Sequence, residues 1–289
     1  MQCQQLYTSL NFRDVMIRSG KLIHDEVGSG LGLDFAGYKQ ERSESGTNKK
    51  VIGLGHSCIA NILHNQPNYL CWELNDDDDL EAYASVPCVY ATAYYALYIR
   101  GGLKENSKVL VHCGAGGVGQ ASLRLCKKRL SHLATQLFVT CGNEDKKNFL
   151  HEEYGIPMEN IGDSRNSSFT KLINKQTDGK GVDMVINSLS GKLLVASIDC
   201  LSFGGILLEL GKSKINGAVM QHLRQGDKQL SMIDLDQLMR NQTAFEPVRK
   251  MIQCGLQNKE ITSIRNKVFN APEEVEEEIE FMSRGGQKK

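Results

Sequence analysis

Residues 111–120 read VHCGAGGVGQ and place four glycines in ten positions, directly after the run KVL (108–110). Within them, residues 114–119 match the pattern G-x-G-x-x-G. The pattern alone is weak evidence, because glycine-rich turns also occur for steric reasons. It becomes informative where a strand precedes it and a helix and a second strand follow it, since that arrangement begins a dinucleotide-binding βαβ unit.

Each glycine in a unit of this kind serves a different purpose. The first makes the tight turn, the second leaves room for the pyrophosphate, and the third lets helix and strand pack closely. The N–H groups and positive dipole end of the helix then bind the phosphates. We therefore expect dinucleotide contacts at Gly114, Gly116, Gly117, Val118 and Gly119; the alternative is a glycine-rich turn without a ligand.

The flanking sequence has the alternation that such a unit requires. Strand patterns occur at residues 108–113, 135–141, 181–189 and 204–210, with helical patterns between them at 116–130, 143–155 and 190–201. Strands that alternate with helices form parallel sheets, so residues 92–235 are predicted to be a doubly wound α/β unit of the Rossmann type. Further helices are expected at 90–103 and 272–285, and the acidic run at 76–79 is expected to cap a helix.

The composition excludes several classes of protein. The chain has 289 residues, and its 34 Lys and Arg balance its 34 Asp and Glu, so it lacks the basic character of proteins that bind nucleic acids or membrane surfaces. Its nine cysteines form no Cys-x-x-Cys pair, which argues against structural zinc. Together with the absence of a signal peptide and of an apolar run of about 18 residues, this predicts a metal-free, cytoplasmic protein.

The end of the second predicted strand indicates which dinucleotide is bound. A carboxylate there would bind the ribose hydroxyl of NAD, but residues 140–143 read TCGN and contain no acid. Lys146 and Lys147 follow within about one helical turn. This favours the 2′-phosphate of NADPH, although both lysines would also suit an ordinary surface. The missing acid also argues against a methyltransferase that uses S-adenosylmethionine.

Six segments resemble a known family in order and spacing: SLNFRDVM (9–16), GLDFAG (32–37), ASVPCVYATAYYALYIRGGL (84–103), VLVHCGAGGVGQASL (109–123), GKGVDMVINSLSG (179–191) and LLELGK (207–212). They resemble the enoyl reductase domain of animal fatty acid synthase, which belongs to the zinc-free, quinone-reductase-like branch of the medium-chain dehydrogenase/reductase superfamily. Highly reducing polyketide synthases carry a close relative. The segment GKL (20–22) stands where some polyketide enzymes place a tyrosine, which favours the fatty acid synthase branch.

The resemblance implies a Rossmann domain inserted into a GroES-like, β-rich substrate lobe. Residues 1–91 and 236–289 would form that lobe, and residues 92–235 would bind NADPH. Relative to the family pattern, strands before residue 9 and after residue 285 are missing. We therefore expect a lobe truncated at both ends, which leaves a non-catalytic NADPH-binding remnant as an alternative.

The resemblance also implies a set of cofactor-binding and substrate-binding residues. Besides the glycine loop, the cofactor-binding residues would be Thr92 beside the nicotinamide, Asn143, Lys146 and Arg165 around the adenosine and its 2′-phosphate, and Asn187, Ser188 and Leu189 along the nicotinamide ribose. Asn11 and Asp14 would line the substrate cleft. A structural cap is the alternative for Asn11, and a plain surface position is the alternative for Arg165.

The reaction implied is the NADPH-dependent reduction of a trans-2-enoyl thioester, carried by acyl carrier protein or CoA, in fatty acid synthesis. Hydride goes to the β-carbon, charge appears on the thioester oxygen, and the α-carbon then takes a proton. Lys212 matches a family lysine that could stabilise the enolate or deliver the proton. Asp236 matches a proposed partner acid, with Asp234 in competition, and water is a third possible donor.

The remaining expectations concern other histidines, partners and alternatives. His24 and His112 fall in no recognisable arrangement of a base and an orienting group, so both are expected to be structural. The implied partners are the other domains of a synthase and a second copy of the chain, bound through the Rossmann domain. A quinone oxidoreductase of the same superfamily would use the same glycine loop without a carrier protein or Lys212.

Overall fold

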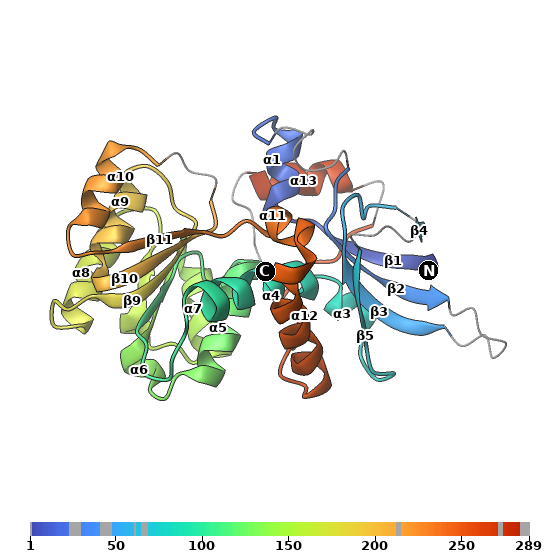
Figure 1. Cartoon of the computed structure of the whole chain (residues 1–289), viewed down its shortest axis with the longest axis horizontal. Helices are drawn as coiled ribbons and strands as arrows, with labels where there is room; N and C mark the ends of the chain where they lie inside the picture. The colour runs from blue at the N-terminus through green and yellow to red at the C-terminus, as the bar shows by residue number, and fades with distance from the viewer. Residues whose placement is uncertain are drawn as a thin grey trace. The chain divides into compact units, whose positions relative to one another are not determined.

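The computed structural model describes residues 2–22, 30–40, 48–60, 62–64, 69–211, 215–270 and 274–283. The chain divides into two compact units (Figure 1). One combines Met1–Ala91 with Leu235–Lys289, and the other is Thr92–Asp234. We call them the antiparallel unit and the parallel unit after their sheets.

The antiparallel unit contains one five-stranded sheet with the order β4-β1-β2-β3-β5. Its strands are β1 (Gln2–Ser9), β2 (Asp34–Gln40), β3 (Lys49–Leu54), β4 (Ile62–His64) and β5 (Leu70–Glu73). Its helices are α1 (Phe12–Arg18), α3 (Leu80–Tyr83), α11 (Leu235–Arg240), α12 (Gln242–Gln257) and α13 (Val275–Ser283). Asp79 caps α3 by accepting from Glu81 N at 3.1 Å, as the acidic run predicted.

Two buried aromatic side chains join the chain's first and last segments in the antiparallel unit. Trp72 Nε1 donates to Arg249 O on α12 at 3.1 Å, and the Tyr90 hydroxyl donates to Thr262 O at 3.0 Å. Both are almost fully buried, so each ring contributes apolar packing while its polar atom is satisfied. The unit is therefore assembled from segments about 170 residues apart.

The parallel unit contains a six-stranded sheet with the order β11-β10-β9-β6-β7-β8. Its strands are β6 (Val109–Val111), β7 (Leu137–Cys141), β8 (Ile161–Asp163), β9 (Val182–Asn187), β10 (Leu201–Glu209) and β11 (Gln229–Met232). All neighbours pair in parallel. Numbered from β6, this is the doubly wound order 6-5-4-1-2-3, which reverses direction at β6.

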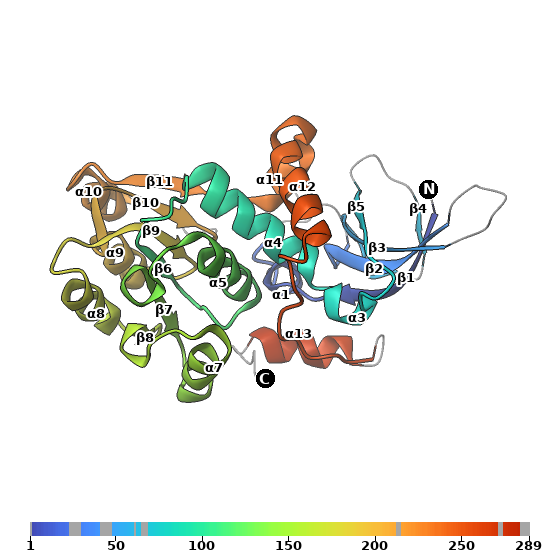
Figure 2. The ribbon, with the colours of Figure 1, turned by 90° about the horizontal axis from the view of Figure 1, so that it is seen from below.

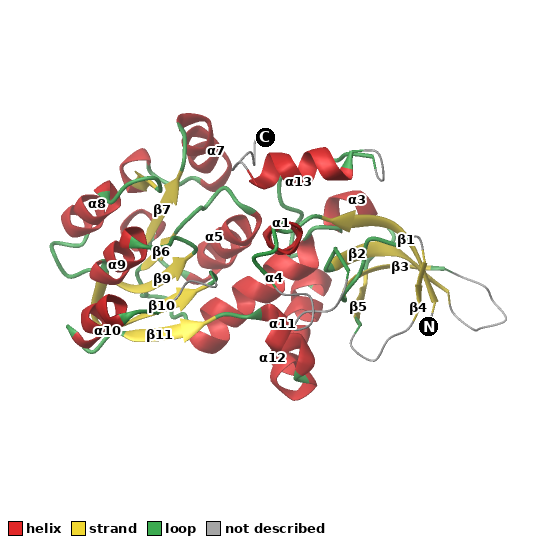
Figure 3. Cartoon of the chain, turned by 90° about the horizontal axis from the view of Figure 1, so that it is seen from above, coloured by secondary structure: helices red, strands yellow, loops and turns green. Residues whose placement is uncertain are grey.

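Helices cover both faces of the parallel sheet (Figure 3). They are α5 (Gly117–Arg129), α6 (Leu133–Gln136), α7 (Glu144–Tyr154), α8 (Ser168–Gln176), α9 (Lys192–Asp199) and α10 (Gly217–Arg224). One core cluster joins α8, α9 and α10 to the sheet through residues such as Ile173, Ile198 and Val219, packed on Val185 and Leu207. In Figure 2 α5 lies on the opposite face.

The expected α/β class, with a doubly wound parallel sheet and a separate β-rich region, is confirmed. The count of four strands in the parallel sheet was wrong. Two strands were missed, because β8 has only three residues and β11 has a weak apolar pattern in which only Ser231 is buried. The helix expected at 90–103 is α4 (Val86–Tyr94) followed by a π-helical turn, Tyr95–Arg100, that ends at Gly101.

None of the described helices is long and apolar enough to cross a membrane. Among the described residues, no cluster of three or more His, Cys, Asp and Glu side chains is placed to hold a metal ion.

We predict that Gly119→Ala lowers the free energy of unfolding by roughly 1–3 kcal/mol. An added Cβ at Gly119 would lie 2.5 Å from Cys113 O and 2.7 Å from Gly114 Cα, so backbone would have to move. Gly217→Ala is the matched control, since a Cβ there meets nothing within 4 Å and alanine favours helix. Urea unfolding followed by circular dichroism measures both, and equal stability of the two variants would contradict the packing argument.

Candidate functional site

The glycine loop connects β6 to α5 in the parallel unit. An added Cβ at Gly114 would lie 2.1 Å from Val139 Cγ1 on β7, and one at Gly119 would meet the backbone of the strand–helix turn. Both positions therefore require glycine for close packing. Gly114 lies in the turn that the Gly116 N–H closes on Cys113 O at 2.8 Å, and the left-handed residue of that turn is Cys113, with φ 53°.

The first turn of α5 is suited to an anion. Its N-cap is Gly116, and no side chain caps the helix. N–H groups in a first helical turn have no partner within the helix, and the dipole places positive charge there. The loop follows β6, where the strand order reverses, and α/β sheets bind ligands at that point. These residues fit the pyrophosphate of a dinucleotide.

His112, between β6 and the glycine loop, is structural as expected. Ser197 Oγ donates to Leu193 O at 2.8 Å and lies 2.9 Å from His112 Nε2, so Nε2 carries the ring proton. Nδ1 then accepts from Thr140 Oγ1 at 2.9 Å. Burial with no opposing charge lowers the pKa of His112 to about 3, so the ring is neutral.

The end of β7 shapes the second part of the predicted cofactor site. Arg165, in the loop after β8, lies against Gly142, since a Cβ added there would be 3.4 Å from Arg165 Nε. Arg165 N is held by Asp163 Oδ1 at 2.8 Å. Asn143 Oδ1 accepts from Lys146 N at 2.9 Å, so Asn143 caps α7. An exposed guanidinium beside an acid-free strand end suits a phosphate.

The loop after β9 is held by Glu209, which the sequence analysis missed. Asn187 Nδ2 donates to Leu189 O at 2.8 Å and to Glu209 Oε2 at 2.6 Å, while Asn187 Oδ1 accepts from Leu189 N at 3.2 Å. Glu209 Oε1 accepts from Gly211 N at 2.6 Å. Burial raises the pKa of Glu209. Asn187 is fully buried and fixes the backbone of this loop, whereas Ser188 is exposed.

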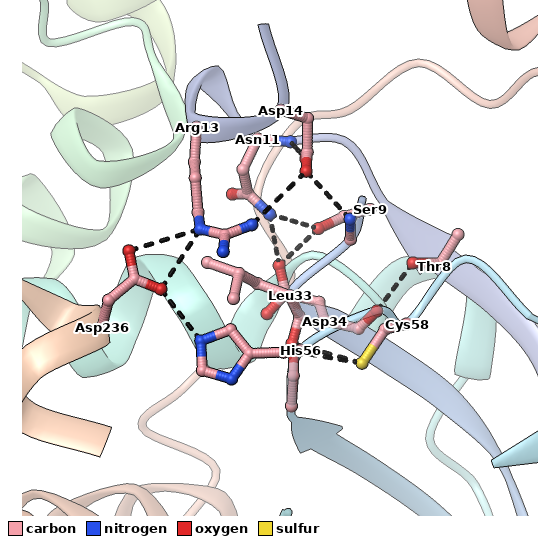
Figure 4. Close-up of polar contacts among 12 residues, drawn as sticks. Thr8, Ser9, Asn11, Arg13, Asp14, Leu33, Asp34, His56, Cys58 and Asp236 are labelled. Atoms are coloured by element: carbon pink, nitrogen blue, oxygen red, sulfur yellow. Dashed lines mark hydrogen bonds and ion pairs between the residues drawn. The ribbon is translucent and has the colours of Figure 1, made fainter. Parts of the chain in front are cut away.

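The antiparallel unit holds a buried polar cluster around Asn11 (Figure 4). Asn11 Nδ2 donates to Asp34 Oδ2 at 2.9 Å, and Ser9 Oγ and Cys88 N also donate to Asp34. Burial raises the pKa of Asp34 to about 7. Asp14 accepts from Asn11 N at 2.8 Å and from Gly32 N at 2.9 Å. Both predicted cleft residues thus fix local backbone or the buried carboxyl of Asp34.

Asp236 lies in a second network of the antiparallel unit (Figure 4). Arg13 Nε lies 3.2 Å from Asp236 Oδ1 and 3.3 Å from Oδ2. His56 Nε2 lies 3.0 Å from Asp236 Oδ1. Neither Arg13 nor His56 was singled out from the sequence, since no local pattern links residues 180 or more positions away from Asp236.

The other predicted site residues are placed as follows. Thr92 is buried at the start of the parallel unit, and Lys146 is half-buried in the first turn of α7. Lys212 and His24 lie outside the described residues. The structure thus gathers the glycine loop, the 142–143 turn, Arg165 and the 187–189 loop in one unit, and Asn11, Asp14 and Asp236 in the other.

Comparisons with known proteins were made for both sequence and structure. No protein-family profile matches the chain. The highly reducing polyketide synthase cla2 of Cladosporium cladosporioides is 38% identical over 221 residues, covering 75% of this chain and 9% of that protein. FUM1, a highly reducing polyketide synthase of Gibberella moniliformis, is 32% identical over 286 residues, covering 96% of this chain and 11% of that protein. The chain spans about a tenth of the length of these relatives.

Solved structures share the fold across nearly the whole chain. The CurK enoyl reductase is 24% identical, with a TM-score of 0.84, and the match covers 99% of this chain and 87% of that one. The quinone oxidoreductase of Escherichia coli, solved with NADPH, is 19% identical, with a TM-score of 0.80 and coverage of 99% and 89%.

We predict that His112 makes the protein less stable as the pH falls from about 6.5 to about 3. In this range the unfolded chain binds a proton at His112 that the folded chain does not, so stability rises with pH by up to about 1.4 kcal/mol per unit. Asp34 has the opposite effect, because its raised pKa makes the folded chain bind a proton that the unfolded chain does not between about pH 4 and pH 7. Its contribution to stability therefore falls as the pH rises through that range.

The measurement is urea unfolding over a pH series. His112→Gln should lose the part of the slope that His112 contributes, and His132→Gln, a change at an exposed histidine, should keep it. A wild-type slope retained in His112→Gln would show that His112 is not the source.

Proposed function

We propose that this chain is the NADPH-dependent enoyl reductase region of a multidomain synthase. Its sequence matches one segment of highly reducing polyketide synthases, and its fold matches that of solved enoyl reductases. Its substrate would be a trans-2-enoyl thioester on acyl carrier protein or CoA. The choice of NADPH rests on the position of Arg165, which lies against Gly142 just after β7, at a strand end that carries no acid.

Two synthase classes fit this proposal. The sequence relatives reported above are polyketide synthases, whereas the motif resemblance favours animal fatty acid synthase. The difference in chemistry is that polyketide chains often carry a methyl branch at the α-carbon, and chains in fatty acid synthesis do not. We propose the unbranched, fatty acid type, and a branched substrate tests the choice.

Residues of the parallel unit would bind and orient the cofactor. The first turn of α5 would hold the pyrophosphate, and Arg165 with Lys146 the 2′-phosphate. The 187–189 loop, fixed by Asn187 and Glu209, would pass the nicotinamide ribose. When bound, NADPH supplies the hydride that reduces the β-carbon of the substrate.

Lys212 and Asp236 are the proposed catalytic side chains. Lys212 follows β10, and the Glu209 carboxylate, bonded to Gly211 N, fixes the backbone that leads to it. An ammonium there would stabilise the negative charge that develops on the thioester oxygen or deliver a proton. Asp236 would act through the groups it contacts, Arg13 and His56.

A quinone oxidoreductase is the second candidate, favoured by the fold match to the enzyme from Escherichia coli. It would not require Lys212 or a carrier-protein partner. A third candidate, a remnant that binds NADPH without turnover, would share the glycine loop alone.

We predict that the purified protein oxidises NADPH with crotonyl-CoA and not with a simple quinone, followed by NADPH absorbance. Lys212→Ala should lower kcat roughly 10²- to 10⁴-fold, because the developing charge would lose its partner. Tigloyl-CoA, which has an α-methyl branch, should be reduced more slowly than crotonyl-CoA.

The contrary results are informative in different ways. Turnover of the quinone alone would identify an oxidoreductase of the second kind. NADPH binding without turnover of any substrate would leave the non-catalytic remnant. A preference for tigloyl-CoA would place the chain with polyketide synthesis.

We predict that Arg165→Ala weakens NADPH binding roughly tenfold to a hundredfold and leaves NADH binding unchanged, because only NADPH has the 2′-phosphate. Titration of the fluorescence of each reduced cofactor measures both dissociation constants. Arg129→Ala, at the far end of α5, is the matched control. Equal weakening of both cofactors by Arg165→Ala would rule out a contact with the 2′-phosphate.

A further inference from the structure

Gln120, in the first turn of α5, binds two successive carbonyl groups of the glycine loop. Its backbone N–H donates to Gly116 O at 2.8 Å, and its side-chain Nε2 donates to Ala115 O at 3.2 Å. A carbonyl oxygen only accepts hydrogen bonds, so the amide nitrogen of Gln120 faces Ala115 and the amide oxygen points elsewhere. Gln120 is almost fully buried, so the contact with Ala115 lies inside the protein.

Tyr154, the last residue of α7, holds the other end of the Gln120 side chain. Its hydroxyl donates to Gln120 Oε1 at 3.1 Å. The tyrosine is buried, and its ring centroid lies 5.4 Å from Arg124 Cζ and 5.8 Å from the ring centroid of Phe149. Because the ring is packed in place, the amide of Gln120 is held with its oxygen toward Tyr154 and its nitrogen toward Ala115.

The peptide between Ala115 and Gly116 is therefore bound through both of its polar groups. Gly116 N donates to Cys113 O at 2.8 Å, and Ala115 O accepts from Gln120. Gly116 has φ −79°, and turning this peptide over would carry that angle into the positive region, which glycine enters readily. Such a rotation would point the Ala115 carbonyl oxygen out of the protein. The hydrogen bond from Gln120 opposes it.

We propose that Gln120 is a positioning residue for the pyrophosphate of the dinucleotide, and that Tyr154 orients it. By keeping the Ala115 carbonyl turned into the protein, Gln120 lets the start of α5 present N–H donors without a carbonyl oxygen among them. N–H groups attract a phosphate, whereas the partial negative charge of a carbonyl oxygen repels it. This inference rests on the cofactor binding proposed above and concerns no step of the reduction itself.

Gln120→Met keeps the length of the side chain and removes both of its hydrogen-bonding groups. It should raise the Kd for NADPH and for NADH by the same factor, roughly threefold to tenfold, because both cofactors contain the pyrophosphate. Arg165→Ala, in contrast, is expected to affect NADPH alone. Adenosine 2′-phosphate, which has no pyrophosphate, should bind Gln120→Met as tightly as the wild type. Fluorescence titration measures the Kd of each reduced cofactor, and displacement of NADPH measures that of adenosine 2′-phosphate.

Gln136→Met is the matched control. Gln136 is also buried, and its Nε2 donates to Glu105 O at 2.8 Å and to Ser107 O at 3.2 Å, beside the amino end of β7. Its loss should lower the free energy of unfolding and leave all three dissociation constants unchanged.

Tyr154→Phe tests the orienting contact, because it keeps the ring and removes only the hydroxyl. It should raise the Kd of both reduced cofactors when Gln120 is present. Added to Gln120→Met it should cause no further increase, since Tyr154 acts through Gln120.

The outcomes distinguish this inference from the proposed function. Unchanged Kd values for both reduced cofactors in Gln120→Met would overturn the role of Gln120. Equal weakening of adenosine 2′-phosphate would also overturn it, because the effect would then be a general disturbance of α5 and α7. A wild type that binds NADPH and reduces no thioester would overturn the enoyl reductase and leave the role of Gln120 standing. A wild type that binds neither NADPH nor NADH would overturn both proposals.

Discussion

The approach of α5 to the end of β6 is the constraint on which the candidate cofactor site depends. An added Cβ at Gly119 would lie 2.5 Å from Cys113 O and 2.7 Å from Gly114 Cα, so the helix meets the turn after β6 with no side chain between them. An added Cβ at Gly114 would lie 2.1 Å from Val139 Cγ1, so the same turn also packs tightly on β7. This contact places the uncapped first turn of α5 at the edge of the sheet where the strand order reverses. The same edge carries the turn at 142–143 and the loop at 187–189, because β7 and β9 flank β6 and run parallel to it.

Much of this region was predictable because its signals are local. The glycine pattern and the apolar pattern of each flanking strand or helix operate over short stretches of roughly ten residues. The partners of Asp236 were not predictable, since Arg13 is 223 positions away and His56 is 180 positions away. Glu209 was missed for a related reason: its place in a strand gives no sign that Asn187, on the neighbouring strand, donates to it.

Buried polar groups organise both units, and each is stabilised by a near-complete set of hydrogen bonds. Asp34 accepts from three donors, and Glu209 accepts from Asn187 and Gly211. Burial without these contacts would cost several kcal/mol for each group. Burial raises the pKa of both carboxyls even so, because hydrogen bonds only partly replace the solvation of a charge. These carboxyls therefore serve to hold neighbouring backbone and side chains in place.

Hydrogen-bond partners also distinguish three buried acids of the antiparallel unit, Asp14, Asp34 and Asp236. Asp14 is bound by two backbone N–H groups, and Asp34 by Ser9, Asn11 and Cys88. Asp236 differs in the charge of its surroundings, because it lies beside the permanently charged guanidinium of Arg13 as well as the imidazole of His56. A carboxylate hydrogen-bonded to one ring nitrogen fixes the direction of the imidazole that it contacts. Asp236 therefore joins the side chains of Arg13 and His56, which lie far from it in the sequence, whereas Asp14 fixes the backbone at Asn11 and Gly32.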